Sequence, residues 1–254
     1  MLSKLLEPVK ALKNRWTMEK SVQDAGTGGP EDQDGETIKF VQPYTMTSPA
    51  RIRALCSATR YVVDADIPGA IVECGVWRGG SMMAVARTLM RLGAQRDLYL
   101  FDTFEGMSEP GPQDVAMTGE SAKRLLDLAQ RTEDDAMWCY APLERVRHAM
   151  SLTEYPVGRI HLVRGKVEDT LQTSAPSSIA LLRLDTDWYE STRHEMEQLF
   201  PRLRKGGVLI LDDYGHWQGA KRAVDEYLEK HQIKLLLHHI DYTGRCAVKV
   251  FETS

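Results

Sequence analysis

The stretch AIVECGVWRGGS, residues 70–81, joins a short apolar run to a glycine-rich turn, and the helical pattern MMAVARTLMRLG follows it directly. Glycines at such a turn let the backbone bend sharply and let a ligand approach it closely. The following helix presents free N–H groups at its start. This stretch predicts a strand, a tight turn and a helix, with a small-molecule site at the turn.

The details of the turn favour S-adenosylmethionine over a dinucleotide. Gly75 and Gly79 have the spacing G-x-x-x-G, whereas dinucleotide pyrophosphates favour G-x-G-x-x-G. Acidic Glu73 would repel a pyrophosphate but suits a cationic or amine-bearing ligand. Asp102 ends the next apolar run, where a carboxylate can accept both ribose hydroxyls. The alternative is a purely structural turn with Asp102 as a helix cap.

The same alternation of apolar runs and helical patterns continues along the chain. Further apolar runs lie at residues 98–102, 160–163, 179–185 and 208–213. Such runs, separated by helices, are typical of a parallel sheet covered on both faces. Ser48-Pro49 predicts the start of a helix that leads into this core. The runs at 233–240 and 246–252 flank a turn at Tyr242-Thr243-Gly244 and predict a closing antiparallel hairpin.

Two segments fall outside this pattern. Residues 1–43 form an N-terminal extension, in which Asp24–Thr37 is rich in Gly, Asp and Glu and predicts a mobile loop. We expect the extension to act as a lid or an oligomer contact. A segment of roughly fifty residues separates the second and third apolar runs, longer than a usual crossover. Its excess, at about 105–142, predicts a substrate lid, and LERVRHAM at 143–150 predicts the crossover helix.

Carboxylates follow two of the other apolar runs. Asp185 and Asp187 come at the end of the fourth run, and Asp212 and Asp213 end the fifth. Adjacent parallel strands bring such residues together at one edge of the sheet. Clustered carboxylates repel unless some are protonated or a cation neutralises them, so Mg²⁺ is the simplest explanation. Helix capping by Asp187 and Asp213 is the alternative, and His216 is a candidate general base.

Composition bounds the remaining possibilities. The chain has 254 residues and a net charge of −4, which gives no electrostatic reason to expect nucleic-acid binding. Its four cysteines form no C-x-x-C pair, and no apolar run is long enough for a stable membrane insertion. Residues 1–16 predict an amphipathic helix, packed on the protein or serving as a peripheral anchor. We expect a cytoplasmic protein.

Five stretches resemble the macrocin O-methyltransferase family (TylF, MycF and NovP), which methylates sugar hydroxyls of macrolide and aminocoumarin antibiotics. They are TMTSPARI at 45–52, IVECGVWRGGS at 71–81, LFDTFEGM at 100–107, LRLDTDWYEST at 182–192 and GGVLILDDYGHWQGAKRAVDEY at 206–227. The resemblance implies a Rossmann-like class I methyltransferase domain at 44–254, with a mostly parallel seven-stranded sheet. It also implies an S-adenosylmethionine- and Mg²⁺-dependent homo-oligomer, and a glycoside as the small-molecule acceptor.

This resemblance, with a more distant one to catechol O-methyltransferase, implies the site residues. It assigns the metal to Asp185, Asp212 and Asp213, and the cofactor to Met46, Glu73, Gly75, Trp77, Gly79, Ser81, Asp102, Phe104, Val167 and Glu168. The lysine base of the catechol enzyme would fall at Trp188, so that role is vacant here. Asp185 is therefore our expected catalytic base, ahead of Asp187 and His216.

The implied reaction moves a methyl group from a sulfonium to a hydroxyl oxygen, while a carboxylate removes the proton. The two rivals are a nicotinamide-dependent oxidoreductase and an S-adenosylmethionine-binding protein without catalysis. The missing G-x-G-x-x-G opposes the first rival, and the carboxylate cluster opposes both. An apolar acceptor pocket could be lined by Tyr44, Met46, Met107, Met117, Trp138 and Tyr140, although such side chains are as often core.

Overall fold

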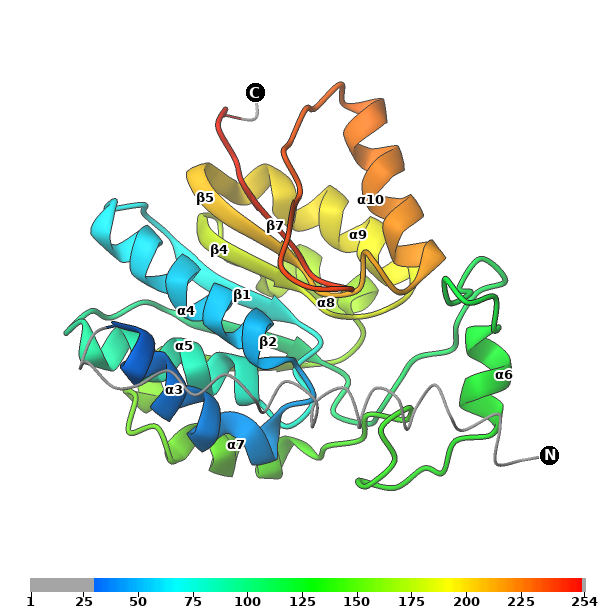
Figure 1. Cartoon of the computed structure of the whole chain (residues 1–254), viewed down its shortest axis with the longest axis horizontal. Helices are drawn as coiled ribbons and strands as arrows, with labels where there is room; N and C mark the ends of the chain where they lie inside the picture. Colours follow the sequence, from blue (N-terminus) through cyan, green and yellow to red (C-terminus); the bar gives the residue numbers. More distant parts are fainter. Residues whose placement is uncertain (1–29, 253–254) are drawn as a thin grey trace.

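The apolar runs of the sequence form the strands of one sheet. The computed structural model describes residues 30–252, and its seven-stranded sheet has the order β3-β2-β1-β4-β5-β7-β6 (Figure 1). The strands are β1 Ala70–Cys74, β2 Leu98–Asp102, β3 Ile160–Arg164, β4 Ile179–Leu184, β5 Leu203–Leu211, β6 His238–His239 and β7 Arg245–Val248. The first five run parallel, and β7 is antiparallel to both of its neighbours. The predicted mostly parallel seven-stranded sheet is confirmed.

Helices cover both faces of this sheet (Figure 1). One face carries α3 Pro30–Val41, α4 Pro49–Asp64, α5 Gly80–Arg91 and α7 Leu143–Ser151, and the other carries α8 Val167–Ser174, α9 Tyr189–Leu199 and α10 Gln218–Lys230. Successive side chains of a strand point to opposite faces, so Ile71 enters one core and Val72 the other. The short elements are η1 Gln42–Tyr44, α6 Ala122–Asp127, η2 Val157–Arg159 and η3 Phe200–Arg202.

The predicted hairpin at the C-terminal end is present but much shorter than expected. β6 contains only two residues of the predicted run at 233–240, and it pairs with β7. Ile233, Leu235 and Leu237 instead pack against the second core without strand pairing. Their apolar character therefore reflects the covering of the core and not a place in the sheet.

The prediction of a mobile acidic loop is wrong from Pro30 onward, because α3 occupies that part of it. Asp34 is buried and pairs with Arg60 of α4, with two N–O distances of 2.7 and 2.9 Å. Arg91 of α5 also donates to the side chain of Thr37 at 2.7 Å. These tertiary contacts hold a polar sequence in a helix on the domain. The rest of the predicted loop and the amphipathic stretch lie outside the described residues.

The long insertion between β2 and β3 lies beside the sheet and contains α6 (Figure 1). Its strand-like contacts join Val115 to Ser121, and Ala116 to Trp217 just before α10. The crossover helix α7 follows where the sequence predicts it. Within residues 30–252, none of the helices has the length and apolar character that a membrane span requires.

Candidate active site

The glycine turn after β1 is packed directly against the end of β4. Gly75 has φ +82°, and a Cβ there would lie 2.0 Å from the carbonyl oxygen of Asp185. The amide of Asp185 donates to the carbonyl of Cys74 at 2.9 Å, so the segments that follow β1 and β4 leave the sheet side by side. Only glycine allows this approach, which places the turn next to the carboxylates of β4.

Asp102, at the end of β2, organises the same turn. Its carboxylate accepts from the amides of Val76 at 2.7 Å, Trp77 at 3.0 Å and Phe104 at 2.7 Å. Burial raises its pKa, and these amide bonds oppose that rise. Since a carboxylate has about four acceptor positions, little capacity remains for the predicted ribose contact. Asp102 therefore stabilises the turn itself, which is the structural alternative that the sequence left open.

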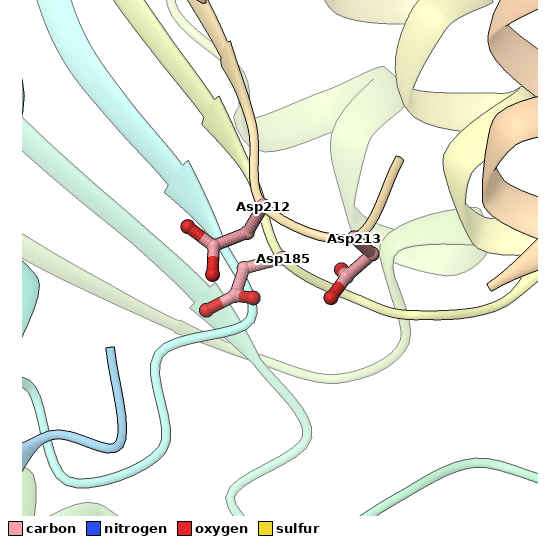
Figure 2. A group of neighbouring side chains, drawn as sticks. All are labelled: Asp185, Asp212 and Asp213. Carbon is pink, nitrogen blue, oxygen red and sulfur yellow. The ribbon is translucent and has the colours of Figure 1, made fainter. Parts of the chain in front are cut away.

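Three aspartates meet where β4 and β5 end (Figure 2). Asp185, Asp212 and Asp213 each place a carboxylate oxygen within 4.8 Å of the other two. Asp213 also accepts from the amide of Asp187 at 3.1 Å. The predicted meeting of these residues at one edge of the sheet is confirmed, and their hard oxygen donors are of the kind that Mg²⁺ prefers.

A buried arginine, absent from our sequence-based prediction, lies among these carboxylates. Arg183 ion-pairs with Glu73 at 2.6 Å, Asp185 at 2.8 Å and Asp212 at 2.7 Å. Glu73 and Arg183 are register partners on β1 and β4, inside two runs that are otherwise apolar. A charged residue inside a buried strand requires a partner, and that rule could have revealed the pair.

A second arginine, Arg51 of α4, also contacts this cluster. It ion-pairs with Asp212 and, at 3.0 Å, with Asp241 in the turn before β7. The side chain of Ser48, which caps α4, donates to the same Asp241 at 2.6 Å. The two arginines therefore supply part of the neutralising charge for which the sequence predicted a metal, with protonation as the other possibility.

The acidic groups still outnumber these two cations. Four carboxyl groups ion-pair with them: Glu73, Asp185, Asp212 and Asp241. The carboxyl groups of Asp187 and Asp213 lie beside this group and interact with it electrostatically. Burial raises the pKa of Glu73 to about 7, and Arg183 opposes the rise. Burial and the nearby Asp185 raise the pKa of Asp187 to about 7. Such a cluster favours the uptake of a proton or of a further cation.

One cavity of about 680 Å³ joins the glycine turn to the carboxylates. Of the predicted site residues, its wall contains Met46, Gly75, Trp77, Ser81, Asp102, Asp185, Asp212 and Asp213. The others lie outside the wall: Glu73, Gly79, Phe104 and Val167 are buried, and Glu168 is exposed at the start of α8.

Half of the expected acceptor pocket is present in the cavity wall. Tyr44, Met46 and Met107 line it, whereas Met117, Trp138 and Tyr140 do not. The wall also includes side chains that we did not predict, among them Thr118, Leu125, Met137 and Cys139. These four come from the insertion, whose loops carry no periodic signal in the sequence.

These features define a class of protein: a Rossmann-like methyltransferase with a carboxylate cluster beside its cofactor turn. The chain belongs to the macrocin O-methyltransferase family, whose model, described as Macrocin-O-methyltransferase (TylF), matches residues 10–248. It is an S-adenosylmethionine-dependent O-methyltransferase, as the sequence predicts. The oxidoreductase alternative is thereby excluded.

Two curated relatives cover most of the chain. The 8-demethyl-8-(2,3-dimethoxy-alpha-L-rhamnosyl)-tetracenomycin-C 4'-O-methyltransferase of Streptomyces olivaceus is 31% identical, and the match covers 92% of this chain and 88% of that protein. The demethyldecarbamoylnovobiocin O-methyltransferase of Streptomyces niveus is 32% identical, covering 79% of this chain and 74% of that protein. Both names describe O-methyltransferases, one acting on a rhamnosyl tetracenomycin C and the other on demethyldecarbamoylnovobiocin.

Solved structures agree with the fold. The structure of the O-methyltransferase NovP has a TM-score of 0.72 and 29% identity, covering 82% of this chain and 83% of that one. The S-adenosylhomocysteine-bound methyltransferase PaMTH1 of Podospora anserina has a TM-score of 0.51 and 15% identity, covering 96% of this chain and 95% of that one. The second likeness concerns the fold alone.

Proposed function

We propose that this enzyme methylates a sugar hydroxyl of a glycosylated natural product of the macrolide or aminocoumarin type, with the help of Mg²⁺. The observation that carries the proposal is the shared cavity, in which the cofactor turn and three converging aspartates face one space. The named acceptors of the relatives support a glycoside, since one carries a rhamnosyl group in its name. A homo-oligomer is part of the same proposal.

The donor set fits a divalent cation. Asp185, Asp212 and Asp213 offer only carboxylate oxygens, and the surrounding acids exceed the two arginines. When bound, Mg²⁺ would supply positive charge that lowers the pKa of the acceptor hydroxyl. Arg183 would hold the carboxylates of Asp185 and Asp212 in place through its two ion pairs.

For the proton acceptor, we now prefer Asp187 to Asp185. Burial raises the pKa of Asp185 well above its usual value, and the ion pair with Arg183 opposes that rise. The proposed cation would lower this pKa further and occupy the carboxylate, so Asp185 would be less available as a base. Asp187 lines the same cavity, and its backbone amide is held by Asp213. A pKa of about 7 suits a general base at neutral pH. His216 lines the cavity too, but burial lowers its pKa.

On the cofactor side, the residues divide into two roles. Gly75, Trp77 and Ser81 line the cavity and would contact the methionine part. Asp102 would hold the turn, and it would reach the ribose only if the hydroxyl of Thr103, which donates to it at 3.5 Å, gave way. Glu73 is fully buried and paired with Arg183, so we propose that it orients this arginine and does not touch the cofactor.

The test is a transfer assay with labelled S-adenosylmethionine and three acceptors: methyl α-L-rhamnopyranoside, an aminocoumarin glycoside and a macrolide glycoside. Mass spectrometry should find a singly methylated sugar in at least one product. The matching aglycones serve as controls and should stay unmethylated. Methylation of the aglycones alone would overturn the proposed acceptor class while leaving the enzyme class intact.

A further inference from the structure

Asp114, in the insertion, caps a helix that belongs to another part of the chain. Its side chain is buried, and its Oδ1 accepts from the amide of Tyr189 at 2.8 Å while Oδ2 accepts from the amide of Gly111 at 2.7 Å. Tyr189 is the first residue of α9, and Trp188 before it provides no side-chain cap. Free amides at a helix start need such an acceptor, and the insertion provides it here.

The same carboxylate also touches the start of α10. Gly219 is the second residue of that helix, and a Cβ there would lie 2.0 Å from Oδ1 of Asp114. Asp114 therefore lies between the first turns of α9 and α10. Both helix starts carry partial positive charge, which stabilises a buried carboxylate. These are the helices that follow the two acidic strand ends of the site.

The residues around Asp114 are tied to the same two loops. The carbonyl of Val115 accepts from the amide of Gln218 at 2.9 Å, and the amide of Met117 donates to the carbonyl of His216 at 2.8 Å. The indole N–H of Trp188 donates to the carbonyl of Ser108 at 3.0 Å. The segment at 108–118 is thus bonded to the loops after β4 and β5.

This segment forms part of the cavity wall. Ala116 and Thr118 line the cavity, as does Met107 just before the segment, and we expect the acceptor to bind against them. A displacement of the wall would change the distance between a bound acceptor and the carboxylates. Misplacement by about 1 Å can cost roughly a hundredfold in rate.

We propose that Asp114 is a positioning residue, which fixes the acceptor wall of the insertion relative to the carboxylates of β4 and β5. It acts through the starts of α9 and α10 and leaves the cofactor turn on β1 and β2 unaffected. In this view, residues 108–118 form a fixed wall, in contrast to the lid that the excess length of the insertion predicts. The kinetic part of the test below rests on the proposed function, and the exchange part does not.

The experiment compares Asp114→Asn, Gly219→Ala and the double variant by hydrogen exchange. Asn keeps the size but removes the charge and one acceptor, while the added methyl group of Ala displaces the carboxylate. Exchange should become faster at 108–121, 186–192 and 214–220 in each variant, with β1 and β2 unchanged. Gly158→Ala, at a glycine with open space around it, and Asp134→Asn, at a fully exposed carboxylate, are the matched controls.

The kinetic readout separates positioning from general instability. With methyl α-L-rhamnopyranoside as the probe, we expect the KM for the acceptor to rise about tenfold or more. The affinity for S-adenosylhomocysteine, measured by calorimetry, should stay within about twofold of wild type. The KM of the double variant for the acceptor should be no higher than that of the more impaired single variant, because both changes act on the same contact.

Three outcomes would overturn the inference. They are an equal weakening of acceptor and S-adenosylhomocysteine binding, a rise in KM in the double variant that equals the product of the two single-variant rises, and faster hydrogen exchange throughout the sheet. If the wild-type enzyme does not methylate the rhamnoside, the proposed acceptor is wrong. The hydrogen-exchange data then still decide the role of Asp114. If Gly219→Ala does not fold, Asp114→Asn alone decides it by the same criteria.

Discussion

At the scale of single residues, a guanidinium buried among carboxylates determines how mutations act. Arg183→Met should leave Glu73, Asp185 and Asp212 without their shared counter-charge. Removing one partner of a buried ion pair costs about 3–5 kcal/mol, because the remaining charges stay buried. Urea unfolding should show a loss of that size. Arg147→Met, at an exposed i,i+3 pair on α7, should change stability by less than about 0.5 kcal/mol.

The base can be tested by comparing two aspartates that line the same cavity. Asp187→Asn should lower kcat by roughly 10²–10⁴-fold, the usual contribution of a general base, without weakening Mg²⁺ binding. Asp185→Asn should weaken Mg²⁺ binding as well, since Asp185 belongs to the three-aspartate cluster. Stopped-flow transfer and metal titration by calorimetry measure both effects. Unchanged turnover in Asp187→Asn would return the role to Asp185.

Glu73 should make stability depend on pH. Burial raises its pKa from 4.5 to about 7, so the folded state binds this proton more tightly than the unfolded state does. The resulting stabilisation is complete below about pH 4.5 and is lost as the pH rises to about 7. Glu73→Gln removes the titration, so its stability should fall less than that of wild type over this interval. If the stability of wild type and of Glu73→Gln changed equally with pH over this interval, the raised pKa of Glu73 would be contradicted.

How much of the site could be predicted depends on what each residue's position reveals. Asp185, Asp212 and Asp213 follow apolar runs, so strand-end geometry alone predicts that they meet. The charges of Glu73 and Arg183 inside apolar runs indicate that each needs a buried partner. The further contacts of Arg183 with Asp185 and Asp212 depend on the order and register of the strands, which the sequence does not reveal. Asp114 lies in a loop without periodicity, and only the folded chain brings it to α9.

At the scale of elements, the close contact between the β1 turn and the β4 end gives a direct prediction. Gly75→Ala would place a methyl group 2.0 Å from the carbonyl of Asp185, at a backbone angle that L-residues avoid. We expect this variant to lose binding of S-adenosylhomocysteine by at least about tenfold, because the turn must move. Gly158→Ala is again the control, and calorimetry is the measurement. Wild-type affinity in Gly75→Ala would contradict this packing.

The elements differ in how well sequence predicts them. Buried parallel strands appear as apolar runs, and β1 and β2 occupy the predicted residues. α3 has a polar composition typical of a loop, and its helix is stabilised by contacts with Arg60 and Arg91 that composition does not reveal. The run at 233–240 is apolar because it covers a core, so pattern alone could not distinguish it from a strand.

At the scale of the whole molecule, the site is a meeting point of charges from separate layers. α4 contributes Arg51, β1 contributes Glu73 and the ends of β4 and β5 contribute the aspartates. The arginines allow the carboxylates to remain together, and the excess of acid leaves affinity for a divalent cation. Because Asp212 contacts both arginines, its removal should destabilise the apo protein, whereas simple repulsion among aspartates would predict the reverse.

The central claim is that methyl transfer needs a cation held by Asp185, Asp212 and Asp213. The most direct measurement is the transfer rate after exhaustive chelation, followed by titration with Mg²⁺, for wild type and for Asp213→Asn. We predict that chelation stops transfer, that Mg²⁺ restores it in wild type, and that Asp213→Asn requires at least about tenfold more Mg²⁺. A full transfer rate after chelation would show that the carboxylates and arginines act without a metal.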